Sequence, residues 1–182
     1  MARNGRRRTV VLGAVLVVAV LAGVGVYWFQ PWKLWTDDEV NDALPLAPAP
    51  SAGAVSGARP AGSAGLRTVA GGGLISHEHT TTGSVKVLEL PDGSRTLRLE
   101  NLVTSNGPDL RVWLTDAPVK EGVAGWRVFD DGKYVSLGKL KANKGDQNYP
   151  IPGDVRLEDY TSVTIWCDRF DVSFGAAELS RT

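Results

Sequence analysis

The sequence predicts an all-β C-terminal domain, an antiparallel β-sandwich or partly closed barrel of about seven to nine short strands, preceded by one N-terminal transmembrane helix. Three observations support this fold class. Residues 10–29 are continuously apolar, residues 45–65 are rich in small residues and proline, and apolar and polar residues alternate through most of residues 71–182. After Gly71 we find no helical pattern longer than about two turns.

The apolar stretch Val10–Phe29 contains no charged side chain. At about 1.5 Å per residue it spans roughly the 30 Å hydrocarbon core of a bilayer, so we expect a transmembrane helix. The positive-inside rule keeps residues 1–9 in the cytoplasm and places the C-terminal part outside, as a single-pass protein of the cell membrane. The basic residues that support this orientation are Arg3, Arg6, Arg7 and Arg8. An aromatic belt is expected at the outer interface, at Tyr27, Trp28, Phe29, Trp32 and Trp35.

A cleaved signal peptide is the alternative interpretation of this stretch. Its apolar core would be about 7–15 residues long, with a small-residue cleavage site close behind. The first such sites, Ala47–Ala49 and Ala52–Ala54, lie well beyond the aromatic belt. An uncleaved anchor that binds the bilayer through residues 10–29 is therefore favoured.

Residues 30–70 are predicted to be a juxtamembrane segment and linker. Between Pro45 and Gly65, 18 of 21 residues are Ala, Pro, Gly or Ser, a composition that buries too little apolar surface to offset chain entropy. We expect the acidic residues at 37–42 to be solvated and residues 36–70 to behave as a flexible tether.

Residues 71–182 are long enough for one domain with its own core. They carry 13 basic and 16 acidic residues, a net charge of −3, and lack the clustered basic face that nucleic-acid binding requires. Nucleic acid is therefore not an expected partner.

Turn residues divide this domain into strands. Pro91–Ser94 predicts a hairpin, Asn106–Pro108 breaks the chain, and Asp130–Gly132 precedes another strand. The predicted strands with period-two alternation include 84–90, 95–101, 110–114, 134–140 and 163–167.

The apolar phase changes after Cys167, the only cysteine of the chain. Apolar residues occupy odd positions from Val163 to Cys167 and even positions from Phe170 to Phe174. An extra residue must be accommodated near Asp168, so we expect the strand to end or bulge directly after the cysteine.

Three ordered blocks of the domain resemble a known family. They are Gly107–Leu114, Leu137–Pro152 and Ser162–Leu179, and together they are similar to the electron-transfer DM domain, the DM-thirteen family. Ala142 stands where the family pattern leads us to expect a glycine. The resemblance implies a β-rich extracellular module, found alone behind a membrane anchor or beside other redox-associated domains. It also implies that Cys167 is a redox thiol or the ligand of a prosthetic group, with a redox partner protein.

The residues themselves allow two interpretations of Cys167. An oxidising compartment and the lack of a second cysteine leave it without an intrachain disulfide. A reactive thiolate needs a nearby cation, and Arg169 is the one cation within two residues. The alternative is a buried cysteine that packs as a small hydrophobic residue.

His77 and His79 have the spacing of two metal ligands on one face of a strand. With Cys167 they would supply the two histidines and one cysteine of a copper site, although no histidine or methionine follows Cys167. The alternative is a pair of solvated histidines on an edge strand. Haem bound non-covalently through Cys167 or a histidine is a further possibility, whereas no C-x-x-C-H motif for covalent c-type haem is present.

A ligand-binding or adhesive module without redox chemistry is the second functional hypothesis. Gln147, Asn148 and Tyr149, in a predicted polar loop at 145–149, have groups suited to polar ligands. Aromatic residues that would offer stacking surfaces are Trp113, Trp126, Tyr134, Tyr149 and Trp166.

A sortase-like cysteine transpeptidase is the third hypothesis, with Cys167, His77 or His79, and Arg169 as its catalytic residues. The short domain, the arginine so close to the cysteine and the histidines at the start of the domain argue against it.

Overall fold

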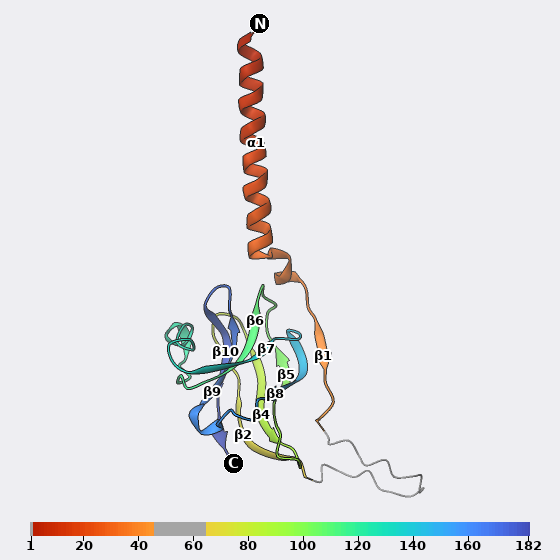
Figure 1. Cartoon of the computed structure of the whole chain (residues 1–182), viewed down its shortest axis with the longest axis vertical. Helices are drawn as coiled ribbons and strands as arrows, with labels where there is room; N and C mark the ends of the chain where they lie inside the picture. The colour runs from red at the N-terminus through yellow and green to blue at the C-terminus, as the bar shows by residue number, and fades with distance from the viewer. Residues whose placement is uncertain (1, 46–64) are drawn as a thin grey trace, which may run out of the picture.

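The computed structural model describes residues 2–45 and 65–182 (Figure 1). Helix α1 (Ala2–Phe29) extends from one end of a two-sheet sandwich, and the C-terminus lies at the other end. The strands are β1 (Glu39–Asn41), β2 (Arg67–Gly73), β3 (Ile75–Ser76), β4 (Thr82–Glu89), β5 (Arg95–Val103), β6 (Leu110–Thr115), β7 (Tyr134–Lys139), β8 (Lys144–Ile151), β9 (Ser162–Cys167), β10 (Val172–Glu178) and β11 (Ser180–Arg181). Short 3-10 helices are η1 (Pro31–Trp35), η2 (Gly122–Gly125) and η3 (Leu157–Asp159).

By length and composition, the helical stretch Val10–Lys33, with a mean hydropathy of 2.7, could span a membrane. Its long apolar side chains, including Leu12, Leu16 and Leu21, are exposed. Lipid can satisfy such a surface, whereas a soluble helix would bury one apolar stripe against its own domain.

The predicted sandwich is confirmed. One sheet has the strand order β1-β8-β5-β4-β2-β11 and the other β3-β10-β9-β6-β7. The hairpin at Pro91–Ser94 joins β4 to β5, and the break at Asn106–Pro108 separates β5 from β6. More strands form than were predicted because β3 and β11 have two residues each, too few to show an alternation, and because β1 lies in the expected tether.

The main core fills the space between the two sheets. Its fully buried side chains include Leu97, Leu99, Leu102, Val112 and Ile165, and each such burial stabilises the fold by about 1.5–3 kcal/mol. A second cluster lies on the other face of the β3-β10-β9-β6-β7 sheet, with Trp113, Trp166 and Phe129 as its large members. Because that sheet is buried on both faces, every residue of β9 is buried.

The acidic residues at 37–42, expected to be solvated, are docked on the domain. Strand β1 pairs in parallel with β8, Asp37 lies 2.6 Å from Lys144, and Asp42 lies 2.5 Å from Lys141. These lysines hold the pKa of each carboxyl below its ordinary value. The expectation of a flexible chain from residue 36 onward is corrected here, since composition alone does not identify partners a hundred positions away.

The sheet also begins earlier than the predicted domain start at Gly71, because β2 starts at Arg67 and pairs with β4. Most of the Ala/Pro/Gly-rich linker, residues 46–64, lies outside the described residues. The segment from Phe29 to Asp42 contacts the sandwich, which therefore lies next to the end of α1 (Figure 1).

Candidate functional site

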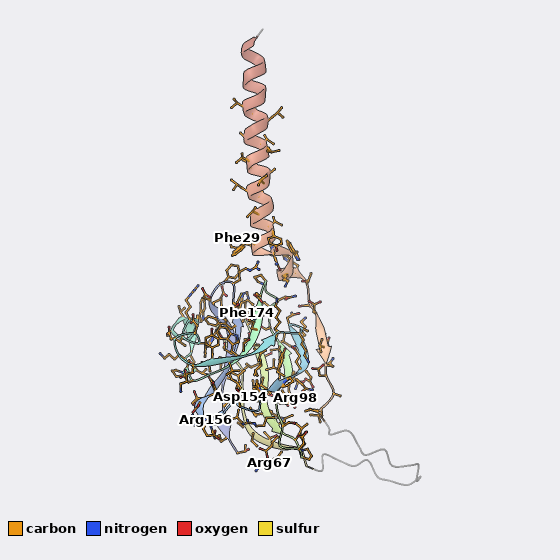
Figure 2. All side chains as sticks on the ribbon, in the orientation of Figure 1. Phe29, Arg67, Arg98, Asp154, Arg156 and Phe174 are labelled. Atoms are coloured by element: carbon orange, nitrogen blue, oxygen red, sulfur yellow. The ribbon has the colours of Figure 1, made fainter. Side chains whose placement is uncertain are left out.

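The end of the sandwich nearest α1, here called the helix-proximal end, contains Cys167. Figure 2 labels Phe29 at the end of α1 and Phe174 in the part of the sandwich nearest to it, with Arg67 and Arg156 at the opposite end of the domain. Strand β9 ends at Cys167, a turn covers residues 168–171, and β10 starts at Val172. The predicted end of the strand directly after the cysteine is confirmed.

The turn after Cys167 is fixed by backbone hydrogen bonds. The Phe170 N–H donates to the Cys167 carbonyl at 3.2 Å, and the Asp168 N–H donates to the Asp109 carbonyl at 2.9 Å. Asp171 adopts a left-handed conformation, with φ 48°, which reverses the chain within few residues. This tight reversal accommodates the extra residue that the change of apolar phase indicated.

Cys167 is fully buried within the main core. Burial raises the pKa of its thiol above the ordinary value of 9.0, the backbone N–H groups of Arg169, Phe170 and Asp109 oppose that rise, and the charge of Glu78 adds to it. Desolvation is the largest of these effects, so the folded protein holds a neutral thiol at physiological pH.

The guanidinium of Arg169 points away from the thiol, toward the end of α1. It donates to the Trp28 carbonyl at 2.6 Å and lies over the Trp28 ring, 4.9 Å from its centroid. The Phe170 ring stacks on Phe29 with centroids 5.8 Å apart. Arg169 therefore acts on the Cys167 pKa through its backbone amide, and its side chain ties the turn to the helix.

A partly buried ion cluster connects the segment before β6, which contains Asp109, to the turn after β9, which contains Asp168. Arg111 Nε lies 3.2 Å from Asp168 Oδ2, Arg111 Nη2 lies 3.3 Å from Asp109 Oδ2, and Lys139 Nζ lies 3.6 Å from Asp109 Oδ1. Because Asp109 directly precedes β6 and Asp168 directly follows β9, Arg111 holds together the two segments that meet at Cys167.

The two histidines do not share one face of a strand. Strand β3 ends at Ser76, and residues 77–79 form a bend, so the alternation on which the expected metal site depended ends before His77. The His77 ring is buried, contacting Ser173 Oγ through Nδ1 at 2.7 Å and the Lys120 carbonyl through Nε2 at 3.0 Å. Burial lowers its pKa. The interpretation of His77 as a solvated edge residue is also wrong.

His79 lies elsewhere, with its ring against Phe174 at a centroid distance of 3.9 Å. Its Nε2 is 3.7 Å from Glu78 Oε2, beyond hydrogen-bond distance. His77, His79 and Arg169 thus have separate partners, and the structure does not assemble them around Cys167 as a transpeptidase would require.

The predicted polar loop at 145–149 is part of strand β8. Gln147 and Tyr149 face inward, where the Tyr149 O–H donates to Gln147 Oε1 at 2.6 Å, and burial raises the pKa of Tyr149 to about 12. Asn148 Nδ2 donates to the Ala43 carbonyl at 2.6 Å and so binds the juxtamembrane segment. The prediction of a loop at 145–149 is wrong: Gly145 and Asn148 are residue types typical of turns, but the segment pairs as a strand.

The tryptophans expected to offer stacking surfaces are largely internal. Trp113 and Trp166 are buried and stack on each other with centroids 5.1 Å apart. Tyr134 remains 47% exposed but stacks on Trp113 at 4.1 Å. These aromatic rings pack the outer face of a sheet.

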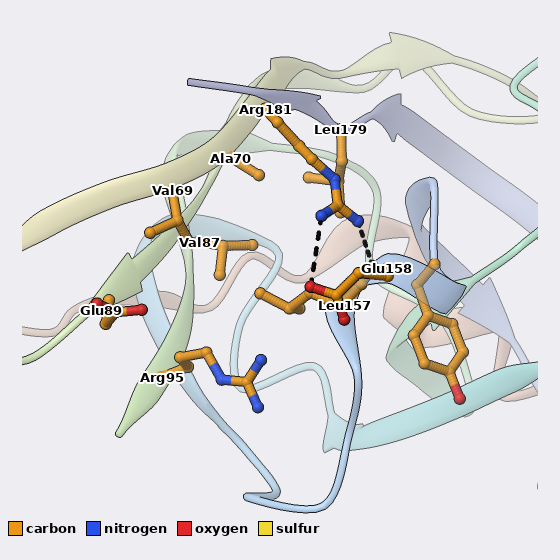
Figure 3. Close-up of a pocket in the computed structure, with 10 residues that line it drawn as sticks. Val69, Ala70, Val87, Glu89, Arg95, Leu157, Glu158, Leu179 and Arg181 are labelled. Atoms are coloured by element: carbon orange, nitrogen blue, oxygen red, sulfur yellow. Dashed lines mark hydrogen bonds and ion pairs between the residues drawn. The ribbon is translucent and has the colours of Figure 1, made fainter. Parts of the chain in front are cut away.

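Cavities occur at both ends of the domain. One of about 220 Å³, here called the interface pocket, lies between the end of α1 and the helix-proximal end and is lined by residues that include Phe29, His79, Phe170 and Phe174. Another, of about 160 Å³, opens at the far end (Figure 3), where Arg181 lies 3.6 Å from Glu158. A third of about 160 Å³ is polar and includes Asp38 in its wall.

The residues do not fit a resident copper ion or haem. Both ring nitrogens of His77 have protein partners, and the described residues contain no group of three or more His, Cys, Asp or Glu side chains able to hold a metal ion. An axial haem ligand must project into a cavity that holds the macrocycle, whereas Cys167 is enclosed by core side chains and lines none of these three cavities.

Comparison with known families matches residues 73–179 to the family described as Electron transfer DM13. The chain belongs to the DM13 family. The match covers more than half of the chain and includes Cys167, the turn after it and both histidines. Searches of curated proteins and of solved structures found no match.

Sequence reasoning found the cysteine of this DM13 domain but missed what surrounds it. The backbone of Asp109, in the turn before β6, lowers the pKa of the thiol, and Phe29 covers the turn at 168–171 from the helix. Ser173 and Thr164 extend the His77 contact as a buried polar chain, with their hydroxyls 2.8 Å apart. The polar phase of β10 carried a weak signal for Ser173, whereas only the tertiary fold identifies Asp109 and Phe29.

Proposed function

We propose that this chain is a single-pass membrane protein whose DM13 domain lies outside the cytoplasm and transfers electrons through the thiol of Cys167. The orientation follows from the basic residues before α1 and the aromatic residues at its other end. The electron-transfer role is supported by membership of the DM13 family.

One observation supports Cys167 as the redox group: it ends β9 at the turn of residues 168–171, and the backbone amides of Arg169, Phe170 and Asp109 lower the pKa of its thiol against the larger effect of burial. Amide donors stabilise a sulfur that carries negative charge, which is the form of cysteine that takes part in thiol–disulfide exchange. In the folded domain, burial raises the pKa of the Cys167 thiol and so disfavours the thiolate. In this proposal, the thiolate forms when the turn at 168–171 opens.

The chain has one cysteine, so a disulfide at Cys167 requires a thiol from a partner molecule. When Cys167 and a thiol of a partner molecule form one disulfide bond, two S–H bonds are broken, and two protons and two electrons pass to an acceptor. The reverse step takes up the same electrons and protons and restores both thiols. Access to the sulfur depends on the turn, which Arg169 and Phe170 attach to α1.

The test uses the full chain in its native membrane, with thiols trapped by a maleimide at lysis. We expect a fraction of Cys167 to be reversibly oxidised, as a mixed disulfide that reductant removes, and expect none in Cys167→Ser. A thiol that stays reduced in the membrane under oxidant, and that reacts with maleimide only after unfolding, would overturn the proposal.

A further inference from the structure

The interface pocket combines an apolar wall with polar groups at the level of the membrane surface. Phe29, Phe170, Phe174 and Pro31 form its apolar wall, and Lys33 and His79 contribute nitrogen atoms. Its volume of about 220 Å³ is below the roughly 300–1,000 Å³ of pockets that enclose a whole drug-sized ligand. It therefore suits one ring-sized part of a larger molecule and is too small for a porphyrin.

The position of this pocket limits what can reach it. It lies where a helix that could span the bilayer ends, and aromatic residues of the kind found at membrane interfaces surround that point. The exposed aromatic side chains there are Tyr27, Trp28, Phe29, Trp32 and Trp35. A molecule dissolved in the bilayer can place its head in the pocket while its tail stays in lipid.

The chemistry of the wall favours a planar ring with hydrogen-bond acceptors. Aromatic side chains stack on flat rings, and the Phe174 ring already packs on His79 at 3.9 Å. Lys33 Nζ donates one hydrogen bond to the Gly107 carbonyl at 3.0 Å and has two further protons to donate. His79 Nε2 lies 3.7 Å from Glu78, too far for a hydrogen bond, so its ring can donate to a ligand oxygen.

We infer that the interface pocket binds the head group of a membrane-soluble quinone. Its flat ring meets the phenylalanines, and its carbonyl oxygens accept hydrogen bonds from Lys33 and His79. A lipid acyl chain would satisfy the apolar wall but leave His79 Nε2 and the two remaining protons of Lys33 Nζ without an acceptor, so it is the less suitable occupant.

This inference names the electron acceptor of the proposed function and rests on it. A quinone takes up two electrons and two protons to become the quinol, which matches what two thiols release when they form a disulfide. The pocket is connected to the cysteine through its wall. Phe170 donates its backbone N–H to the Cys167 carbonyl at 3.2 Å, Phe174 belongs to the same core cluster as Cys167, and the charge of Glu78 acts on the Cys167 pKa.

Binding can be measured on the full chain in nanodiscs, by quenching of tryptophan fluorescence with a short-tailed benzoquinone and a short-tailed naphthoquinone. We expect saturable quenching by at least one of them, weakened about tenfold or more in Phe170→Ala and in Lys33→Gln. Leu157→Ala, a large-to-small change in the cavity of Figure 3 at the far end of the domain, is the matched control and should bind as the natural chain does.

Lys33→Gln is the second variant because Lys33 lies outside the hydrophobic core, so weaker binding in this variant cannot be attributed to a disrupted core. Quenching that does not saturate, or that Leu157→Ala weakens as much as Phe170→Ala does, overturns the inference. An alkylbenzene without carbonyl groups that competes as well as the quinones, regardless of Lys33→Gln, also overturns it and identifies an acyl-chain pocket.

Cys167→Ser separates this inference from the proposed function. The variant should bind quinone as tightly as the natural chain, because the thiol does not line the pocket. Quinone binding with an inert Cys167 would refute only the proposed function, whereas a redox-active Cys167 without quinone binding would refute only the inference.

Discussion

At the scale of single residues, burial determines the protonation state of the two groups that the sequence singled out. Cys167 and His77 both lie within the domain, and desolvation disfavours the charged form of each, which raises the pKa of the thiol and lowers that of the imidazole. His77 is consequently a structural residue that joins β10 to the Lys120 segment.

The lowered pKa of His77 makes stability depend on pH. Below its ordinary pKa of 6.5 the unfolded chain takes up a proton that the folded chain does not, so the free energy of unfolding falls as pH falls from 6.5 toward the folded pKa. His77→Gln should remove this slope and cost about 1–3 kcal/mol at neutral pH, because Ser173 or Lys120 loses a buried partner.

Urea unfolding of the full chain in detergent, at about pH 7.5 and about pH 5.5, measures both effects. The matched control is His79→Gln, which leaves the buried imidazole of His77 in place and should keep its slope. An unchanged slope in His77→Gln would contradict the account of this residue.

Replacing the sulfur tests packing separately from chemistry. Cys167→Ser puts a hydroxyl of similar size among apolar neighbours, and we expect the free energy of unfolding to fall by about 1–3 kcal/mol without a change in circular dichroism. Loss of the folded domain in this variant would show that Cys167 is needed for the fold itself.

At the scale of elements, the turn at 168–171 and strand β1 attach the domain to the helix. The turn is attached through the Arg169 contact with Trp28 and the Phe170 contact with Phe29. Strand β1 pairs with β8. The buried guanidinium of Arg98, on the neighbouring strand β5, donates to Asp146 of β8 at 2.6 Å and to the Asp42 carbonyl at 3.1 Å.

Releasing the turn should expose the thiol. In Arg169→Ala the hydrogen bond and the cation–π contact to Trp28 are lost, so we expect maleimide to label Cys167 in the folded full chain several-fold faster. Arg156→Ala, which removes an exposed arginine paired with Asp159 at the far end, is the control. Equal labelling rates in both variants would show that the helix contact does not restrict access.

Gly145 permits the close approach of β1. Its φ is +95°, and an added Cβ would collide with the Val40 carbonyl, so Gly145→Ala should cost about 1–3 kcal/mol and increase hydrogen exchange at residues 40–42. Gly153→Ala, where a Cβ would meet open space, should change neither quantity. Retained protection of β1 in Gly145→Ala would contradict its docking.

The sequence predicted elements where a local pattern controls them. Alternation identified the strand that ends in Cys167 and its inward face, and the change of apolar phase predicted the turn after it. The bend at His77 and the docking of Asp37 and Asp42 were not predicted, since both depend on partners far along the chain: Ser173 and Lys120 in the first case, and the basic residues near β8 in the second.

At the scale of the whole molecule, the segment from Phe29 to Asp42 contacts the sandwich through Phe170 and Lys141 and keeps the side of the domain that contains Cys167 toward the helix. If the proposed orientation is correct, that side faces the outer surface of the membrane. Quinones of the bilayer and the thiol are then close together, while the far end of the domain faces away from lipid.

The orientation has a direct test. In the proposed orientation, the arginines before α1 keep the N-terminus inside, so protease added to intact spheroplasts should remove everything beyond residue 29. The same treatment after lysis is the control for cleavage of the folded domain. Protection of the C-terminal domain in intact spheroplasts would reverse the proposed topology.

The central claim, that Cys167 is a reversible redox group, is tested most directly by titrating the full chain in nanodiscs against glutathione redox buffers. The fraction of Cys167 held as a mixed disulfide is counted by intact mass after alkylation. We predict a reversible transition that follows the ratio of oxidised to reduced glutathione and is absent in Cys167→Ser. A Cys167 that remains a free thiol at every ratio would contradict the claim.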